Sequence, residues 1–345
     1  MPKPGEHKTV QSRILEYAGD VGWTVVSREE AERRRDFDPS SPSGLRGTSH
    51  EAAPKGQARN ASLFFDDLLE AKVREFNPRY NEAKGALLGR FRHFHADIFG
   101  NREFVEHLRN RGFFDPEDNR ERDLILIDYD DLTRNDYEVT EEFAFHNGHY
   151  GCREDVVFLI NGVPVLVIEC KNANKDEAIA LGIDQIRRYH RETPELFVPE
   201  QLFTATDAIG FSYGVTWNIV RRNIFTWKDD EIGRLETKIK SFCAIPQVLA
   251  FLKEYILFAE KDEELNKYIL RQHQVSGVER VVRRALDPSR TRGLVWHTQG
   301  SGKTFTMIKA AEMLFRAPEA EKPTILLMID RNELEDQMLK NLAAV

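Results

Sequence analysis

Residues 154–171 read EDVVFLINGVPVLVIECK, and this stretch decides which fold the chain can adopt. It holds two apolar, β-branched runs, at 156–160 and 165–170, separated by Asn161-Gly162, a dipeptide typical of two-residue hairpin turns. The second run is apolar on both faces, which indicates a central strand of a sheet. Charged residues seldom occupy such a place without a partner or a function. Glu169 and Lys171, at the end of this run, are therefore the first candidates for a functional site.

Phosphodiester cleavage explains why these residue types occur at this spacing. The reaction requires a positioned water, neutralisation of the charge that builds on the phosphate, and a stabilised leaving oxygen. Asp155 and Glu169, on adjacent predicted strands, are suited to hold a hard divalent cation through oxygen ligands. Lys171 follows Glu169 by two residues and projects from the same strand face, where it can orient or deprotonate a water. Gln185 and Tyr189 lie four residues apart and share one helix face.

A plain salt bridge between Glu169 and Lys171 at a strand end is the simpler alternative, because E-x-K alone is a common pattern. The upstream Asp155 and the downstream Gln-x-x-x-Tyr helix extend that pair to a set of five residues. The combination favours a nuclease site that depends on a hard divalent cation.

Hydrophobic periodicity divides the rest of the chain into helical and strand segments. Helical patterns begin near residue 9 and cover 63–76, 86–111, 176–191 and 245–286. Further strands are predicted at 124–127, 139–145, 202–206, 213–217, 219–227, 293–296 and 324–330. Residues 33–59 are rich in Ser, Pro, Gly and charge, so we predict a mobile surface insertion there.

The composition is that of a folded chain in a reducing compartment. The 345 residues are 41% hydrophobic and 10% aromatic, which is enough for a core. Three cysteines without CxxC spacing argue against a zinc cluster or a disulfide scaffold. Without a signal segment or an apolar run of membrane length, a cytoplasmic protein is expected. The net charge of -8 weighs only mildly against DNA binding, because local basic stretches such as the arginines between 280 and 292 can hold DNA.

A second site is predicted at TQGSGKT, residues 298–304, between a predicted strand and a helix that begins at Lys303. Glycines let backbone N–H groups close around phosphates, and the helix N-terminus adds the positive end of its dipole. Lys303 would reach the β- and γ-phosphates of ATP, and the Thr304 hydroxyl would ligate Mg²⁺. The residues expected to bind the nucleotide in this loop are Thr298, Gly300, Ser301, Gly302, Lys303 and Thr304.

The set of five residues resembles the PD-(D/E)xK nucleases, although Glu154-Asp155 stands where the name of the fold has Pro-Asp. The resemblance implies an α/β fold, a mixed sheet flanked by helices. It also implies that Asp155 and Glu169 bind Mg²⁺ with help from the backbone carbonyl of Cys170, and that Lys171 is the catalytic lysine.

Two further residue roles follow from the same resemblance. Gln185 and Tyr189 resemble an extra motif of type I restriction subunits and some related nucleases, where it serves nuclease function or DNA contact. The fold often has an acidic residue on its first helix, and Glu6 and Glu16 are the candidates.

The loop at 298–304 resembles motif I of superfamily 2 helicases and translocases, the opening of a RecA-like P-loop motor domain. Asp330-Arg331 resembles motif Ia, whose implied role is contact with the DNA strand. Arg271-Gln272-His273-Gln274 resembles the Q motif, in which a glutamine reads the adenine. Gln274 is the first choice for that role and Gln272 the second.

In this order, the motifs resemble the R (HsdR-like) subunit of a type I restriction-modification enzyme over nearly the whole chain, as an N-terminal fragment. The resemblance implies ATP-driven translocation of double-stranded DNA, coupled to Mg²⁺-dependent endonuclease cleavage of unmodified foreign DNA. The implied partners are a modification (methyltransferase) subunit and a specificity subunit, with no membrane. The expected domains are a nuclease domain at 1–244, a helical connector with the Q-motif-like segment at 245–292, and an incomplete first motor lobe at 293–345. The fragment is expected to bind nucleotide weakly without hydrolysing it.

Three other functions share parts of this pattern. A nuclease-helicase of DNA repair or of modification-dependent restriction would share the chemistry and differ in its partners. A non-catalytic docking module of a DNA motor is disfavoured by the intact Asp155, Glu169 and Lys171. A nucleotide-dependent signalling ATPase is disfavoured by the nuclease pattern and by Asp330-Arg331.

Overall fold

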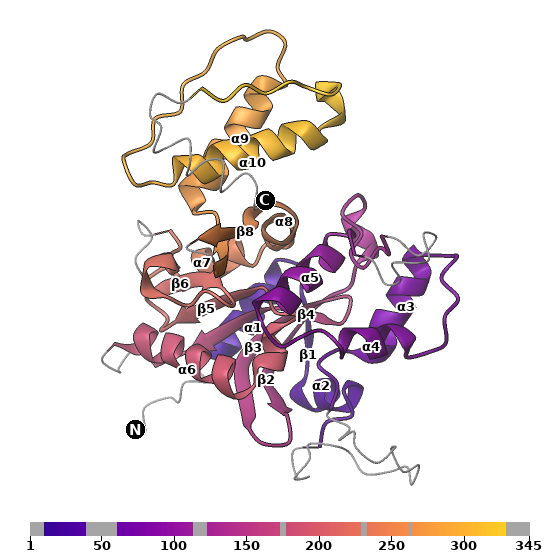
Figure 1. Cartoon of the computed structure of the whole chain (residues 1–345). Helices are drawn as coiled ribbons and strands as arrows, with labels where there is room; N and C mark the ends of the chain where they lie inside the picture. Colours follow the sequence, from indigo (N-terminus) through magenta and orange to yellow (C-terminus); the bar gives the residue numbers. More distant parts are fainter. Residues whose placement is uncertain are drawn as a thin grey trace. The chain divides into compact units, whose positions relative to one another are not determined.

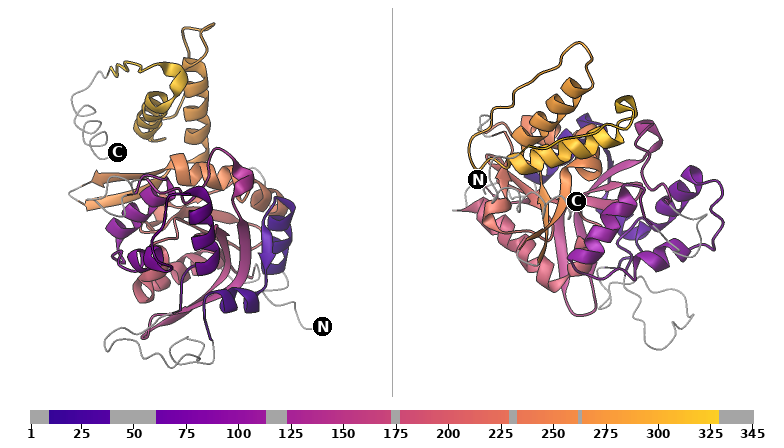
Figure 2. Two further views of the ribbon diagram at one scale, coloured as in Figure 1. Left: turned by 90° about the vertical axis from the view of Figure 1, so that its right-hand side faces the viewer. Right: turned by 45° about the horizontal axis from the view of Figure 1, so that its top comes forward.

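The computed structural model describes residues 10–38, 61–112, 123–172, 177–228, 233–261 and 264–328. The chain forms two compact units, Met1–Leu252 and Lys253–Val345. Figure 1 shows the elements of both units, and Figure 2 shows that helices lie on both faces of the sheet in the first unit, with α1 (Ser12–Asp20) and α6 (Ala178–Glu192) on opposite faces. None of the helices in the described ranges has both the length and the apolar composition to cross a membrane.

A seven-stranded mixed sheet forms the centre of the first unit, with its strands in the spatial order β1 to β7. The strands are β1 Thr24–Val26, β2 Tyr137–His146, β3 Gly151–Ile160, β4 Val163–Cys170, β5 Leu202–Thr206, β6 Phe211–Val215 and β7 Phe225–Thr226. β1 pairs with β2 and β4 with β5 in parallel, and the other neighbours are antiparallel. α6 makes the crossover between β4 and β5 and packs on both strands. The expected α/β class is thus confirmed.

The remaining helices of the first unit surround this sheet. They are α2 Arg28–Arg34, α3 Asp66–Phe76, α4 Ala86–Phe91, α5 Ile98–Leu108, α7 Leu235–Phe242 and α8 Ile245–Ala250. The helix predicted at 86–111 is divided into α4 and α5, because Asp97 caps a new helix by accepting from the N–H groups of Phe99 and Gly100, both at 2.9 Å. Most of the insertion predicted at 33–59 lies outside the described residues, and its first two residues belong to α2.

The predicted hairpin between β3 and β4 is confirmed. Asn161 and Gly162 both have positive φ, 52° and 80°, as a two-residue primed turn requires. Gly162 is also constrained by packing, because a Cβ there would lie 2.8 Å from the carbonyl oxygen of Phe65. Every residue of β4 is buried. This strand is therefore central, and its C-terminal end carries the candidate catalytic residues.

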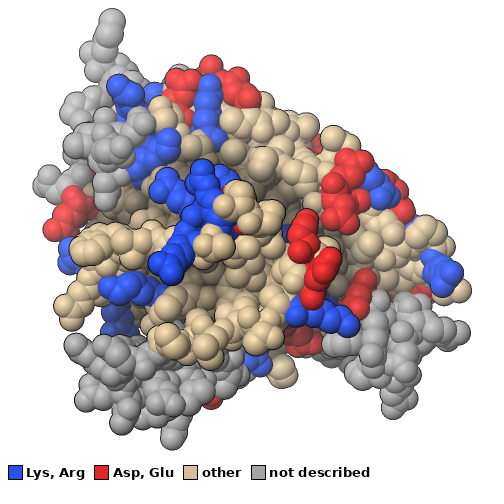
Figure 3. All heavy atoms as spheres, turned by 90° about the horizontal axis from the view of Figure 1, so that it is seen from above, with Lys and Arg blue, Asp and Glu red and all other residues tan. Residues whose placement is uncertain are grey.

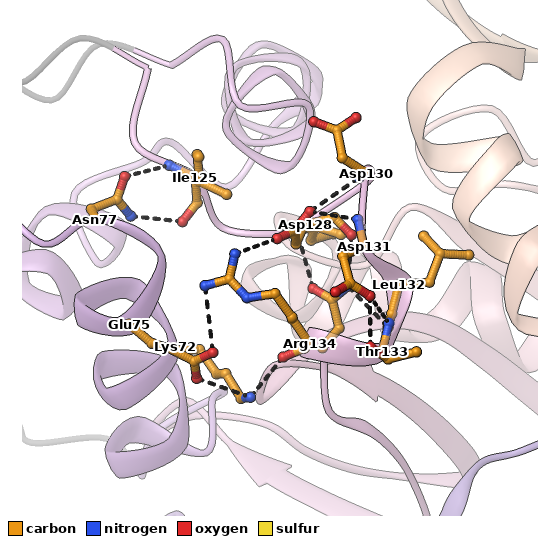
Figure 4. Close-up of polar contacts among 12 residues, drawn as sticks. Lys72, Glu75, Asn77, Ile125, Asp128, Asp130, Asp131, Leu132, Thr133 and Arg134 are labelled. Atoms are coloured by element: carbon orange, nitrogen blue, oxygen red, sulfur yellow. Dashed lines mark hydrogen bonds and ion pairs between the residues drawn. The ribbon is translucent and has the colours of Figure 1, made fainter.

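The strand predicted at 124–127 is wrong, since an irregular, largely buried segment takes its place. Asparagine side chains satisfy its backbone in place of a neighbouring strand. The Asn77 amide exchanges two hydrogen bonds with the backbone of Ile125, at 3.0 and 2.9 Å, and Asn110 binds the next two residues in the same way. Figure 4 shows the pair of Asn77 and Ile125 together with the polar contacts of Arg134. The apolar run predicted burial, but only the tertiary structure supplies these amides.

The second unit begins with a β-hairpin, β8 (Ile256–Lys261) and β9 (Glu264–Ile269), followed by α9 (Gln272–Ala285) and α10 (Lys303–Arg316). The continuous helical pattern predicted at 245–286 is therefore wrong in its middle. Residues 255–259 are consecutively apolar and all buried, and such a run fits a buried strand as well as a buried helix. The strand at 219–227 is likewise reduced to β7, after a 3₁₀ turn at Arg221–Asn223.

The strands predicted at 293–296 and 324–330 are not formed in the part of them that the structure describes. A strand exists only where a neighbour supplies hydrogen bonds, and no strand pairs with either segment among the described residues of the unit. Leu294 and Trp296 are each 85% exposed. The helix that begins at Lys303 is confirmed.

Candidate active site

Asp155, Glu169 and Lys171 lie together where β3 and β4 meet. Nζ of Lys171 is 3.2 Å from a carboxylate oxygen of Glu169 and 3.7 Å from one of Asp155. The backbone N–H of Lys171 donates to the Thr206 carbonyl at 2.8 Å, which continues the β4–β5 pairing past the end of β4. The sheet itself thus holds the lysine beside the two acids.

Cys170 joins the two strands through its backbone. Its N–H donates to Oδ2 of Asp155 at 2.7 Å, and its carbonyl accepts from Nζ of Lys171 at 2.9 Å. These bonds fix the Asp155 carboxylate against β4 and turn the ammonium group toward the Cys170 carbonyl. The predicted metal ligands and the predicted catalytic lysine therefore occupy one small volume.

The carboxylate of Glu169 is buried and incompletely hydrogen-bonded. Its side chain is fully buried, and one of its carboxylate oxygens has no hydrogen-bond partner. Burial raises the pKa of Glu169 well above its ordinary value, the negative charge of Asp155 raises it further, and Lys171 opposes the shift. A buried, unpartnered carboxylate oxygen beside a second carboxylate fits a divalent cation, which would favour the ionised forms.

The donor set at this position is small. Among the described residues, no three His, Cys, Asp or Glu side chains are grouped so that they could hold a metal ion. A hard cation here would therefore take two carboxylates and the Cys170 carbonyl from the protein and leave its other positions to water and phosphate. Glu16 is exposed on α1, and Glu6 lies outside the described residues.

Gln185 and Tyr189 lie on α6 and are hydrogen-bonded to each other. The Gln185 amide donates to the Tyr189 hydroxyl at 2.8 Å, and that hydroxyl donates to the carbonyl of Arg153 at 2.9 Å. Burial, followed by the charge of Glu169, raises the pKa of Tyr189. The pair thus holds β3 two residues before Asp155.

α6 approaches the site closely at Gly182. A Cβ at this position would lie 3.1 Å from Ala205 Cβ, 3.6 Å from Lys171 Cγ and 3.8 Å from Glu169 Cβ. The glycine therefore lets the helix backbone rest on the strand ends that carry the candidate residues.

Sequence reasoning missed Glu200 and Arg35, and it gave Glu154 no role. The side chains of Glu154 and Glu200 are fully buried and close to each other. Burial raises the pKa of both, and that of Glu200 rises to about 8. The buried guanidinium of Arg35 opposes the shift of Glu154. No local pattern links these residues, because Glu200 precedes β5 and Arg35 follows α2.

The loop at 298–304 is the candidate phosphate-binding loop. Gly300 and Gly302 have φ of 76° and 79°, a conformation that favours glycine, and α10 begins at the next residue. Nζ of Lys303 donates to the carbonyls of His297 and Thr298 at 3.0 and 3.1 Å. Gln274 binds the loop at Gly302, at 2.9 Å. The Asp330-Arg331 segment lies outside the described residues.

Basic side chains are gathered locally despite the acidic net charge. Figure 3 shows Lys and Arg side chains gathered mainly on the left half of the face seen from above, and most Asp and Glu side chains on its right half and at its upper edge. In the second unit, four arginines are exposed on α9 and after it: Arg280, Arg283, Arg290 and Arg292. Local basic surfaces of this kind are compatible with binding to a polyanion.

The fold and the grouped acids define a class, the α/β proteins with a candidate metal-assisted hydrolytic site on the sheet. Comparison with known families then identifies the relatives of this chain. A model described as the N terminus of the type I restriction enzyme R protein matches residues 3–216, and the chain belongs to this family. A second model, described as the SWI2/SNF2 ATPase, matches residues 273–345.

Curated relatives carry names of the same kind. A protein of Methanocaldococcus jannaschii, named as the MjaVIIP type I restriction enzyme endonuclease subunit, is 32% identical over 241 residues, which are 63% of this chain and 22% of the relative. The HindI endonuclease subunit of Haemophilus influenzae is 27% identical over 309 residues, 82% of this chain and 29% of that protein. The SauCOLORF180P subunit of Staphylococcus aureus is 29% identical over 227 residues, 64% of this chain and 24% of that protein. The chain spans about a quarter of the length of these relatives.

Proposed function

We propose that this chain carries the nuclease site of a type I restriction endonuclease subunit, in a fold of the PD-(D/E)xK kind, and takes part in Mg²⁺-dependent cleavage of unmodified double-stranded DNA. The observation that carries the proposal is the placement of both acids, Asp155 and Glu169, within 3.7 Å of the Lys171 ammonium. Membership of the R protein family supports the same conclusion.

Each residue has a distinct part in the proposed reaction. Asp155, Glu169 and the Cys170 carbonyl would hold Mg²⁺, which when bound neutralises charge on the phosphate and lowers the pKa of a bound water. Lys171 places a hydrogen-bond donor beside both acids, where it can orient the attacking water and stabilise the phosphate. Glu169 is buried, so its surroundings have a lower effective dielectric constant than water, and this strengthens these interactions.

The second unit is proposed to bind ATP as the start of a RecA-like motor that translocates DNA. Lys303 would contact the β- and γ-phosphates, and Thr304 would ligate the Mg²⁺ of the nucleotide. The positive φ of both loop glycines and the SWI2/SNF2 match support this role. The proposed partners are the modification and specificity subunits of a type I complex.

The nuclease proposal is tested by Lys171→Ala in the full-length subunit, assembled with its partner subunits. Loss of a group that positions water and phosphate should reduce DNA cleavage by about 100-fold or more, because general acid–base groups contribute 10² to 10⁴. ATP hydrolysis should continue. Lys84→Ala, at a side chain that is 78% exposed, is the control and should cleave at the parental rate. Parental cleavage by the Lys171 variant would instead identify a non-catalytic docking module.

The proteins that bind the subunit distinguish this proposal from the alternative, a nuclease-helicase of DNA repair. The tagged full-length subunit, expressed from its own locus, should co-purify with a methyltransferase and a specificity subunit. Isolation of an active nuclease that lacks both would favour the repair function.

A further inference from the structure

The N-terminal turn of α9 lies against the loop at 298–304, within the second unit. Gln274 makes two hydrogen bonds there with the two ends of its amide group. Its oxygen accepts from the backbone N–H of Arg271 at 2.8 Å, which caps the helix, and its nitrogen donates to the carbonyl of Gly302 at 2.9 Å. One side chain therefore connects the start of α9 to the residue that immediately precedes α10.

Neighbouring contacts make the same connection. A ring nitrogen of His273 is 3.1 Å from the carbonyl oxygen of Ser301. A Cβ on Gly277 would lie 3.2 Å from the ring of His297 and 3.4 Å from Thr306, so α9 lies close to the residues on either side of the loop. A Cβ on Gly302 would collide with the Gln274 amide nitrogen. The loop is thus packed on α9 through its backbone as well as through Gln274.

The position of Gln274 is unsuited to a residue that only recognises a base. Its side chain belongs to a residue that is 4% exposed, and both ends of the amide are engaged by protein backbone. Gln272, two residues earlier, is exposed. A buried amide that bonds to loop backbone can affect a ligand of that loop whether or not the ligand carries a base.

We propose that Gln274 is a positioning residue that fixes the phosphate-binding loop, and that it strengthens binding of the triphosphate moiety independently of the base. This inference rests on the proposed nucleotide site. Phosphate-binding loops work by presenting backbone N–H groups in one fixed arrangement. The bond from Gln274 to Gly302 restrains that arrangement directly before Lys303 and Thr304, the residues proposed to contact the phosphates and the cation.

The test uses a ligand without a base. Binding of ATP and of inorganic tripolyphosphate, each with Mg²⁺, is measured by calorimetry on the 345-residue chain and on Gln274→Met, which keeps the side-chain volume and removes both hydrogen bonds. Loss of the hydrogen bond to Gly302 should weaken the binding of both ligands by the same factor, about tenfold. Gln272→Met is the matched control on the same turn and should leave tripolyphosphate binding unchanged. Thermal unfolding of both variants checks that the second unit remains folded.

Each outcome decides the inference. Equal losses for the two ligands, with an unchanged unfolding temperature, support it. Weaker binding of ATP with parental binding of tripolyphosphate would overturn it and return Gln274 to adenine recognition, while leaving the nucleotide site intact. Lys303→Ala should abolish binding of both ligands. If the parental chain binds neither ligand, the proposed nucleotide site itself is wrong, and the role of Gln274 falls with it.

Discussion

Three glutamates around the candidate active site, Glu154, Glu169 and Glu200, have fully buried side chains. Removal from water disfavours a charged carboxylate, and burial is the largest cause of the raised pKa of each. Glu154 and Glu200 lie close enough for each carboxyl group to influence the pKa of the other. Glu169 differs because Lys171 and the proposed cation would stabilise its ionised form. At the scale of single residues, the site therefore combines one buried acid beside a cationic side chain with a buried pair of acids in which burial disfavours the ionised forms.

Glu200→Gln tests the protonated pair through stability. The pKa of Glu200 is about 8 in the folded chain, against an ordinary value of 4.5. The folded state therefore keeps a proton that the unfolded state releases between these values, so the free energy of unfolding falls as pH rises through this window. The fall should be shallower in the variant, by at most about 1.4 kcal/mol per pH unit. Urea unfolding at pH 5, 6, 7 and 8 in about 1 mM chelator measures it.

The exposed Glu16 provides the control for this experiment, since Glu16→Gln should reproduce the parental pH profile. A Glu200 variant whose unfolding free energy falls as steeply as that of the parent would show that Glu200 is ionised in the folded chain.

Residue patterns predicted the acids and the lysine of the site but not their surroundings. Asp155, Glu169 and Lys171 lie on consecutive strands of one hairpin, so local spacing determines their proximity. Glu200 and Arg35 reach the same region from distant parts of the chain, and only the tertiary fold brings them there. The roles of all five residues in the proposed set stay predictions.

At the scale of elements, the hairpin, α6 and β5 could be predicted because each has its own periodicity and turn signal. The segment at 124–127 could not, because Asn77 and Asn110 replace the partner strand that its apolar run would need. The strand that begins within residues 255–259 could not be predicted either, because a continuous run of apolar residues does not distinguish a buried strand from a buried helix. Sequence therefore predicted burial more reliably than the type of element.

Gly182→Ala tests whether the close approach of α6 matters. Alanine in place of a helical glycine ordinarily stabilises by roughly 0.5–1 kcal/mol. At Gly182 the new methyl would lie 3.1 Å from Ala205 Cβ, so α6 and β5 must separate by a few tenths of an ångström beside Lys171 and Glu169. The variant should gain less stability than Gly19→Ala on α1, where the methyl has no neighbour within 4 Å, and its full-length form should cleave DNA more slowly. If both variants were stabilised equally and the Gly182 variant cleaved DNA at the parental rate, the close approach of α6 to the strand ends would have no role in cleavage.

At the scale of the whole molecule, the nuclease candidates and the proposed phosphate-binding loop belong to separate compact units, Met1–Leu252 and Lys253–Val345. The two family matches follow the same division, with residues 3–216 in the first unit and 273–345 in the second. Chemistry proposed for one unit therefore uses no side chain of the other. We propose that the full-length subunit cleaves DNA only after moving it. Loss of the motor should then also prevent cleavage, whereas loss of the nuclease site should leave the motor active.

Lys303→Ala and Asp155→Ala, each in the full-length subunit assembled with its partners, test this one-way dependence. The Lys303 variant should lose ATP hydrolysis, and with it translocation and cleavage of an intact DNA circle, because the lysine contact with the phosphates is removed. The Asp155 variant should lose cleavage by about 100-fold or more, since a charge-stabilising group is removed, and should keep ATP hydrolysis. ATP hydrolysis and cleavage are measured in the same reaction, by phosphate release and by conversion of supercoiled DNA. Loss of ATP hydrolysis in the Asp155 variant would mean that the nuclease unit also controls the motor, and the proposed division of labour would be wrong.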